Sequence, residues 1–377
     1  MKYVIMIFLL LLLCQCKEQC ESIDCGPYGT CISGECNCDE GWTGDNCNIT
    51  NSELAKCSRH QDSLSLVELY NATNGQDWTY NGNLYRGIPF EDDIPVKNYN
   101  SEWDFTQPIT TWHGIEVNTF GCLSRIMLFD CNLIGDLPEL NFPTVEYFVC
   151  SQNLLTGTMP DLSNLPRIEV FDCTLNKLTG NIRNPSGLQN LRHFQCGGNN
   201  LTGTIPDFRD LPKLERFGCN VNDLTGIMLT LSGLPSLTSF SCTRNSLSGA
   251  IPKLENLPSL VSFYCSDNQM TGNIPCLSEL PSLIHFSTHG NQLSGPIPNL
   301  IDLPNLKSFY CYDNQLSGCM PLNERICSNK AYNFKDNPGL AWEGDYERVC
   351  NNENQIGAPC ITSNGSAGNI SMDCNCE

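Results

Sequence analysis

The stretch "LPRIEVFDCTLNKLTGNI", residues 165–182, returns almost unchanged as "LPSLTSFSCTRNSLSGAI" at 234–251 and as "LPNLKSFYCYDNQLSGCM" at 303–320. Asparagine and glycine each recur every 23 residues: Asn153, Asn176, Asn199, Asn222, Asn245, Asn268, Asn291 and Asn314, and Gly157, Gly180, Gly203, Gly226, Gly249, Gly272, Gly295 and Gly318. A fixed period of about 20 to 29 residues predicts a solenoid. In such a fold each repeat packs only against its neighbours.

Within each repeat, the apolar positions predict a strand with one buried face. Phe194 and Cys196 are two residues apart, so their side chains point to the same side of an extended chain. The same pair returns one repeat later as Phe217 and Cys219. We therefore expect a mainly β and irregular solenoid with a parallel sheet along one side. We also expect each repeated asparagine to bond the backbone where its strand ends.

Cysteine occupies the inward position beside phenylalanine in almost every repeat, at Cys150, Cys173, Cys196, Cys219, Cys242, Cys265 and Cys311. Thr288 fills this position once, and Cys131 of the first repeat falls at the asparagine position. Neighbouring strands lie about 4.8 Å apart, more than the ~3.8 Å between the Cβ atoms of a relaxed disulfide. We therefore expect buried, reduced thiols that fill the core and no metal site in this dry row.

The repeat unit L-x-x-F-x-C-x-x-N-x-L-[ST]-G-x-I-P resembles the leucine-rich repeat of plant surface receptors and of some bacterial surface proteins. The resemblance implies a superhelix whose parallel sheet lines a concave face, with about nine repeats over residues 126–322. Residues 323–377 are expected to form a C-terminal cap, marked by "NFKDNPGLAW", and a cysteine-rich tail. The disulfide pairs of this tail do not follow from the sequence.

The segment 51–125 precedes the repeats and resembles the N-terminal cap of extracellular leucine-rich repeat proteins, in which a similar "LxxLYxxTxGxxW" run occurs. Such a cap covers the open end of a solenoid core. Cys57 and Cys122 flank the segment, and we expect them to pair. The run "DSLSLVELYNATNGQDW" predicts a short helix with three apolar residues near one face, Leu64, Val67 and Leu69.

Six cysteines between residues 18 and 48 stand at gaps of four, five, four, one and eight residues, and this spacing resembles an EGF-like module. Bridges must replace a core in so short a segment, because it buries too little apolar surface. The residues before the first cysteine lack the acidic and amide cluster of calcium-binding members, so no calcium is expected. The resemblance implies the pairs Cys20 with Cys31, Cys25 with Cys36 and Cys38 with Cys47.

Residues 1–16, "MKYVIMIFLLLLLCQC", resemble an export signal, with a lysine before an apolar run about half as long as a bilayer span. "LCQCKEQ" resembles the lipobox of bacterial lipoproteins, in which the sulfur of Cys16 carries the lipid, although Gln15 replaces the usual small residue. Plain signal cleavage is the alternative. We expect an extracellular or cell-surface protein, held by an outer-membrane lipid anchor if Cys16 is modified.

The net charge and the absence of catalytic motifs argue against two classes of function, nucleic-acid binding and enzymatic activity. The chain has 41 acidic and 21 basic residues, for a formal net charge of -20, which argues against nucleic-acid binding. It contains no HExxH, G-x-S-x-G or phosphate-loop motif. His285 and His289 are about 13 Å apart along one strand face, too far to share a metal ion. We expect no enzymatic activity, no cofactor and no metal.

The remaining function is recognition on the concave sheet. Most residues that flank phenylalanine and cysteine there are small and polar, but one group in the last three repeats is large and aromatic. We call it the aromatic patch, and with the acidic residues at its strand ends it comprises Tyr264, Asp267, His285, His289, Tyr310, Tyr312 and Asp313. Aromatic faces with hydrogen-bonding groups suit a sugar or a partner's extended loop. The alternative is that the tyrosines pack on neighbours across strands.

We therefore expect a monomeric, non-enzymatic adhesion or ligand-binding protein with a protein or carbohydrate ligand. The alternative is a secreted inhibitor of a wall-degrading enzyme or a receptor-ectodomain-like protein, as the plant resemblance implies. A remote alternative is ice binding by a row of hydroxyls before the repeated glycines: Thr156, Thr179, Thr202, Thr225, Ser248, Thr271, Ser294 and Ser317. Such hydroxyls more often bond local backbone.

Overall fold

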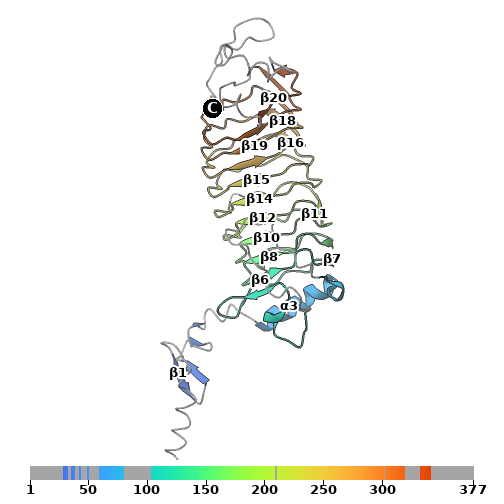
Figure 1. The fold of residues 1–377 in the computed structure, drawn as a ribbon, viewed down its shortest axis with the longest axis vertical. Helices are drawn as coiled ribbons and strands as arrows, with labels where there is room; N and C mark the ends of the chain where they lie inside the picture. The colour runs from blue at the N-terminus through green and yellow to red at the C-terminus, as the bar shows by residue number, and fades with distance from the viewer. Residues whose placement is uncertain are drawn as a thin grey trace, which may run out of the picture.

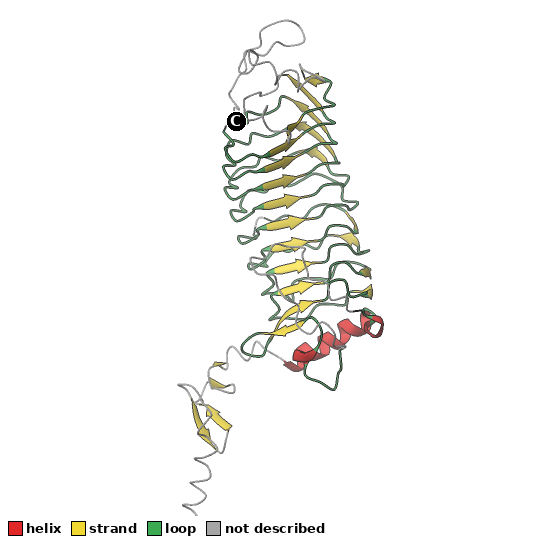
Figure 2. Cartoon of the chain, in the orientation of Figure 1, coloured by secondary structure: helices red, strands yellow, loops and turns green. Residues whose placement is uncertain are grey.

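The structure is a computed structural model that describes residues 29–32, 35–38, 42–43, 49–50, 59–79, 103–208, 210–300, 302–318 and 332–340. The repeats stack as a solenoid, and each turn contributes one strand to a long main sheet (Figures 1 and 2). Within the described ranges, nine strands from β6 to β21 run parallel in this sheet, β23 extends it, and β5 pairs with β6 antiparallel. The prediction of a parallel repeat solenoid with about nine turns is confirmed.

The strands of the main sheet are short because each repeat turns away after two to five extended residues. Their bounds are β5 Ile115–Val117, β6 Leu123–Met127, β8 Tyr147–Val149, β10 Val170–Asp172, β12 His193–Gln195, β14 Arg216–Gly218, β15 Ser239–Ser241, β17 Ser262–Tyr264, β19 His285–Ser287, β21 Ser308–Tyr310 and β23 Tyr332–Asn333.

A second row of parallel strands, which the sequence did not predict, forms where the L-[ST]-G part of each repeat runs extended. It consists of two pairs and one five-stranded sheet. The strands are β7 Ile134–Asp136 with β9 Leu154–Thr156, β11 Thr179–Asn181 with β13 Asn200–Thr202, and β16 Ser248–Ala250, β18 Gln269–Asn273, β20 Gln292–Gly295, β22 Gln315–Gly318 and β24 Gly339–Leu340.

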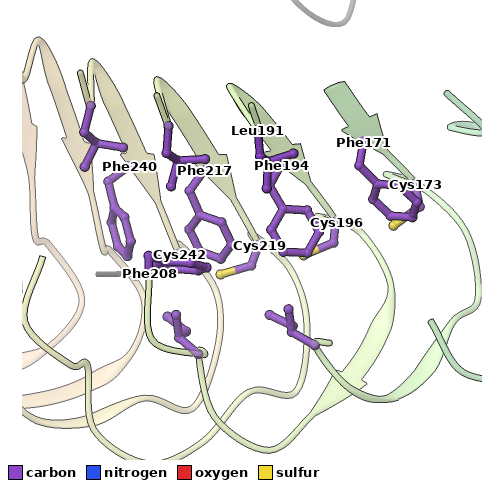
Figure 3. Packing of buried hydrophobic residues seen from close by; sticks show 14 of the residues in the cluster. Phe171, Cys173, Leu191, Phe194, Cys196, Phe208, Phe217, Cys219, Phe240 and Cys242 are labelled. Carbon is purple, nitrogen blue, oxygen red and sulfur yellow. The ribbon is translucent and has the colours of Figure 1, made fainter. Parts of the chain in front are cut away.

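Phenylalanine and cysteine fill the core in two parallel rows (Figure 3). The rings of Phe194, Phe217 and Phe240 are buried, with centroids of neighbours 5.9 and 5.4 Å apart. Eight cysteines are buried and not disulfide-bonded, as predicted: Cys131, Cys150, Cys173, Cys196, Cys219, Cys242, Cys265 and Cys311. Burial raises the pKa of Cys131 to about 12, which suppresses the reactive thiolate.

The repeated asparagines bond the backbone where each strand ends, as predicted. Asn199, for example, donates from Nδ2 to the carbonyls of Cys173 and Cys196 at 3.0 and 3.1 Å, and accepts from the Leu178 amide at 3.0 Å. The row begins at Asn153 and continues one step beyond the predicted list, to Asn337 in the terminal half-repeat. Each amide therefore ties its own turn to the preceding one and satisfies backbone groups that the fold buries.

The residue before each of these asparagines has a left-handed backbone conformation. This holds at Asp267 and Asp313, with φ of 54° and 53°, and at Gly290 between them, with φ of 63°. Asp, Asn and Gly tolerate this region. Leu175 and Val221 occupy the same position with φ of 54° and 55°, although their side chains disfavour it.

The N-terminal end of the solenoid is covered by helix α3, Arg59–Ala72, with the 3-10 turns η1, Gly75–Asp77, and η2, Ile109–Thr111. The predicted buried face was wrong in one residue, because Leu64 is 51% exposed while Leu66 and Leu69 are buried. Three tryptophans complete this cap core, Trp78, Trp103 and Trp112.

Other sequence predictions meet the structure only in part. Cys122 is disulfide-bonded, and its predicted partner Cys57 lies outside the described residues. Of the expected EGF-like module, only backbone strands are described: β1 Gly29–Ile32 with β2 Glu35–Cys38, and β3 Trp42–Thr43 with β4 Ile49–Thr50. The export signal, Cys16 and most of the tail lie outside the described residues. Within the described part of the chain, no helix combines the length and apolarity that a membrane span requires.

Candidate ligand-binding face

The main sheet has one face toward the core, and we call the opposite face the outer face. Repeats 2 to 9 are numbered by their asparagines, from Asn153 to Asn314. On the outer face, residues at the same strand position align in columns because consecutive strands pair at a constant register. One column, for example, aligns Tyr264 of β17 with Ser287 of β19 and Tyr310 of β21. Each column can therefore be compared from repeat to repeat.

In repeats 1 to 3 the outer face is packed. Met127, Phe129, Val149 and Val170 are buried there and form a second apolar cluster, against which Tyr147 packs. The guanidinium carbon of Arg125 also lies 4.5 Å from the centroid of the Tyr147 ring. For Tyr147, the alternative that outer-face tyrosines pack on their neighbours is therefore correct.

In repeats 3 to 5, charged residues just before the main-sheet strands form ion pairs. Arg192 bonds Glu215 at 2.9 Å and lies 3.9 Å from Glu169. His193 lies on the outer face, yet it is buried, with Nε2 3.4 Å from Glu215. Burial lowers the pKa of His193 to about 4, so the imidazole is neutral at pH 7 and does not offer a charge to a ligand.

The aromatic patch in repeats 7 to 9 is different, because two of its side chains make no hydrogen bond or ring contact within the described part of the chain. Tyr264 and Tyr310 stand on either side of Ser287 in the sheet register. Both are partly exposed, and neither side chain makes a hydrogen bond or ring contact with another residue of the described chain. Rigid, solvent-facing rings of this kind supply contact area at low entropic cost.

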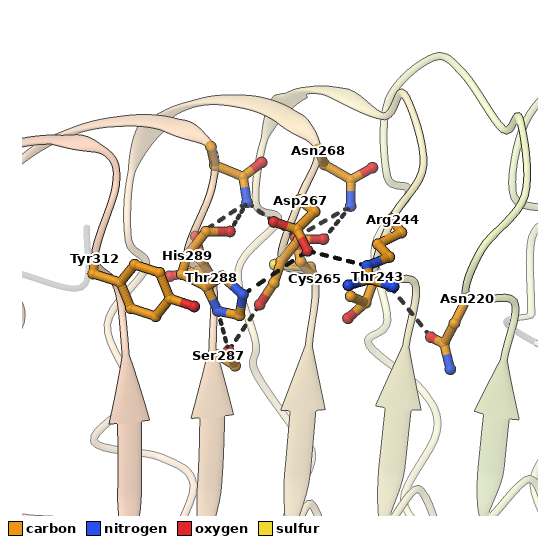
Figure 4. A network of polar contacts seen from close by, with 12 residues as sticks. Asn220, Thr243, Arg244, Cys265, Asp267, Asn268, Ser287, Thr288, His289 and Tyr312 are labelled. Atoms are coloured by element: carbon orange, nitrogen blue, oxygen red, sulfur yellow. Dashed lines mark hydrogen bonds and ion pairs between the residues drawn. The ribbon is translucent and has the colours of Figure 1, made fainter. Parts of the chain in front are cut away.

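Ser287 lies between the two tyrosines and is held by its neighbours. Its Oγ is 2.8 Å from Ser266 Oγ and 2.9 Å from His289 Nδ1 (Figure 4). The His289 ring stacks on Tyr312, with centroids 4.3 Å apart and planes 10° apart. Ser287 is therefore buried although it lies on the outer face. The residue between Tyr264 and Tyr310, which we call the serine floor, is therefore small and polar, and its hydroxyl is held in place.

Acidic residues end the strands beside the tyrosines. Asp267 lies 3.6 Å from Arg244 and 3.9 Å from His289 Nε2 (Figure 4). Asp313 makes no ion pair within the described residues and is exposed. Burial, and then the charges of Asp267 and Asp313, raise the pKa of Tyr312.

The two histidines of the patch do not form a metal site. His285 Nδ1 is 2.8 Å from Ser308 Oγ, and His289 Nδ1 bonds Ser287. Across the residues that the structure describes, no cluster of three His, Cys, Asp or Glu side chains is placed to hold a metal ion. The seven predicted patch residues thus lie on neighbouring strands or at their ends, with His289 and Tyr312 in direct contact.

Three of the eight hydroxyls in the row on the second set of strands bond the backbone. Thr179 donates to the Gly157 carbonyl at 3.0 Å, and Thr225 and Ser248 lie 3.4 Å from the corresponding carbonyls of Gly203 and Gly226. A fourth, Thr156, bonds the Asp136 carboxylate at 2.6 Å. The backbone partners belong to the preceding repeat, whereas the sequence predicted bonds to local backbone.

The sequence analysis missed the packed outer face of repeats 1 to 3. The signal was present, because Ile126, Met127, Leu128 and Phe129 form a continuous apolar run, whereas a strand with one solvated face alternates. The burial of His193 and Ser287 had no such signal, since it depends on neighbours from other repeats.

No protein-family model and no curated protein matches the chain. Solved structures do. A plant peptide hormone receptor, RGFR1 in complex with RGF2, is 31% identical over 55% of this chain and 34% of that one, with a TM-score of 0.50. The Arabidopsis receptor kinase HAESA, in complex with the peptide hormone IDA and the co-receptor SERK1, is 28% identical over 58% and 38%, with a TM-score of 0.53.

The leucine-rich repeat ectodomain of GASSHO1/SCHENGEN3 from Arabidopsis thaliana, in complex with CASPARIAN STRIP INTEGRITY FACTOR 2, is 27% identical over 73% of this chain and 35% of that one, with a TM-score of 0.52. The chain thus covers 34% to 38% of the length of these three structures. Period, asparagine row and comparisons agree that the described repeats form a leucine-rich repeat solenoid structurally similar to plant receptor ectodomains.

Proposed function

We propose that the protein is a non-enzymatic recognition protein that binds a protein or glycan ligand on the outer face of repeats 7 to 9. The observation that carries the proposal is that Tyr264 and Tyr310 are partly exposed and have no side-chain hydrogen bond or ring contact among the described residues, while the tyrosine of repeat 2 is packed. Binding energy at interfaces concentrates on such aromatic side chains. The receptor structures with bound peptides, similar in fold over about half of this chain or more, add support for a peptide or protein ligand.

The test replaces Tyr264, Tyr310 and Tyr312 together by Ser. These side chains are partly exposed, so the variant should fold, and it should lose a few kcal/mol of binding energy, about a hundredfold or more in Kd. Binding is measured on a glycan array and by capture of partners from the protein's native environment, followed by titration with the purified partner. A matched control replaces Gln195 and Arg216 of the same face by Ser and should bind normally.

Normal binding by the triple variant, with loss of binding after disruption of residues 18–48, would move recognition to the N-terminal segment and make the solenoid a spacer. For that segment, we propose the EGF-like pairing given above and display of the protein outside the cytoplasm, with a lipid on Cys16. The sequence spacing and the lipobox resemblance support these two proposals. The mass of the mature N-terminus tests the lipid directly.

A further inference from the structure

Repeats 7 and 9 carry the same short motif on the outer face, and repeat 8 between them does not. Residues 264–268 read Tyr-Cys-Ser-Asp-Asn and residues 310–314 read Tyr-Cys-Tyr-Asp-Asn, whereas residues 287–291 read Ser-Thr-His-Gly-Asn. Because the strands are in register, Tyr264 and Tyr310 flank Ser287. In the same way, Asp267 and Asp313 stand on either side of Gly290. Repeats 7 and 9 therefore each offer one aromatic ring and one carboxylate, and we call these two pairs, Tyr264 with Asp267 and Tyr310 with Asp313, the walls of the candidate site.

The spacing of the two walls suits a narrow group. Tyr264 and Tyr310 are two strands apart, about 9.6 Å between their backbones. A methylene chain or a planar guanidinium held between two ring faces needs about 7 to 8 Å, twice a carbon contact distance. Ser287 does not obstruct this space, because its hydroxyl is turned to Ser266 and His289.

Among the described residues, the carboxylates of Asp267 and Asp313 are only partly neutralised. Arg125 and Arg192 of the earlier repeats lie within ion-pair distance of other carboxylates, and Arg244 is the described arginine that pairs with Asp267. Asp313 makes no ion pair within the described chain, and Asp267 has only Arg244, whose side chain is 70% exposed, and His289 at 3.9 Å. A neutral sugar would cover the rings and leave these carboxylates uncompensated, whereas a cation would match both.

The geometry points to a cation seat: a Lys or Arg side chain of a peptide ligand lies between Tyr264 and Tyr310, with its charge toward Asp267 and Asp313. The inference rests on the proposed function, and it specifies the ligand as a basic peptide. The rings contribute cation–π attraction, the carboxylates contribute charge-assisted hydrogen bonds, and the serine floor leaves room for the alkyl stem.

The experiment titrates the full-length protein with three pentapeptides, Gly-Gly-Arg-Gly-Gly, Gly-Gly-Lys-Gly-Gly and Gly-Gly-citrulline-Gly-Gly, and follows the imidazole NMR signals of His285 and His289. The Arg and Lys peptides should bind, and the neutral citrulline peptide, which has nearly the shape of the Arg peptide, should bind at least about fivefold more weakly. Affinity should fall as salt rises, because part of the attraction is between exposed charges.

Two pairs of variants separate ring-face binding from hydroxyl bonding. Tyr264→Phe with Tyr310→Phe keeps both ring faces and should bind the Arg peptide as the wild type does. Tyr264→Leu with Tyr310→Leu keeps apolar bulk without a π face and should weaken binding about five- to tenfold. A separate variant, Asp313→Asn, should weaken binding and reduce its salt dependence.

Equal binding of the citrulline and Arg peptides, or no binding of any of the three, would overturn the cation seat. Glycan binding that is lost in the Phe pair would also overturn it, since it would depend on the tyrosine hydroxyls. None of these results contradicts the proposed function, which is wrong only if the triple serine variant binds its native partner as tightly as the wild type does. The two ideas can therefore fail separately.

Discussion

The outer face of the main sheet differs between its two ends, although one continuous apolar core lies beneath both. In repeats 1 to 3 the face carries Met127, Val149 and Val170, which are buried in an apolar cluster. In repeats 7 to 9 the column of Met127 and Val149 carries Tyr264, Ser287 and Tyr310, with two partly exposed rings, and the column of Val170 carries Ser262, His285 and Ser308. One end therefore uses the outer face for stability, and the other leaves it available for a ligand.

The difference shows how a repeat protein separates folding from function. The phenylalanine and asparagine rows bind each turn to the next from repeat 2 to repeat 9, whereas repeat 1 has Ile126 and Cys131 at these positions. The outer columns have no part in those rows, so their residues vary from repeat to repeat at little structural cost. A binding surface can therefore occupy a few repeats while the others act as scaffold.

The largest expected effect tests the packed end. Replacing Val149 by Asn places a polar amide at a position that is 0% exposed, and it should lower the free energy of unfolding by about 3 kcal/mol. The matched change, Tyr264→Asn, lies in the same column at the open end and should cost less than about 0.5 kcal/mol. Urea unfolding of both variants measures the contrast, and equal costs would mean that the two ends do not differ in packing.

A second, smaller effect concerns pH and the ion-paired middle repeats. Because burial lowers the pKa of His193 to about 4, the unfolded chain binds a proton at this residue more readily than the folded chain. Stability contributed by neutral His193 is therefore present above about pH 6.5 and is lost as the pH falls toward 4. Between pH 7.5 and 5 the loss should be about 2 kcal/mol.

His193→Gln should remove most of this pH dependence, which urea unfolding at the two pH values measures. NMR of the wild type gives an independent check, since the His193 signals should not titrate above about pH 5 in the folded protein. A normal titration midpoint near 6.5 would show that water reaches this ring, and that the middle of the outer face is more open than its burial indicates.

Much of the fold could be predicted from the sequence because the same pattern occurs in every copy of the repeat. Phe217 and Cys219 share a face in one copy and in every copy, so the inward rows and the reduced thiols followed from spacing alone. The second row of strands was missed, because three residues per strand around a glycine carry little strand signal. Leu64 was misplaced because a short helix leaves its buried face ambiguous by one turn.

The residues of the candidate site could be predicted from the sequence, but which of them pack against neighbours and which remain accessible to a ligand could not. The sequence placed Tyr147 and Tyr264 on the same face, and only their neighbours distinguish them. Arg125 and an apolar cluster pack against Tyr147, whereas the Tyr264 side chain makes no hydrogen bond or ring contact within the described chain. Neighbours in a solenoid come from repeats 23 residues away, so the distinction depends on register as well as pattern.

The smallest expected effect concerns the one polar member of the cysteine row, which lies beneath the open end. Thr288 is 0% exposed, and its hydroxyl has no hydrogen-bond partner among the described residues. A buried hydroxyl without a partner costs about 1 to 3 kcal/mol. Thr288→Val keeps the shape and removes the hydroxyl, so it should raise the free energy of unfolding by about 1 kcal/mol, measured from the urea midpoint at constant slope.

The control for this change is Cys242→Thr, which places the same hydroxyl at the same column of repeat 6 and should lower stability by about 1 to 2 kcal/mol. Both backbones already satisfy their asparagines through the carbonyl of this residue, so neither change disturbs that row. If Thr288→Val raises the free energy of unfolding and leaves peptide binding unchanged, the unpaired hydroxyl lowers stability and has no role in binding. A loss of stability instead would mean that the hydroxyl is bonded, and that the core beneath the aromatic patch is polar by design.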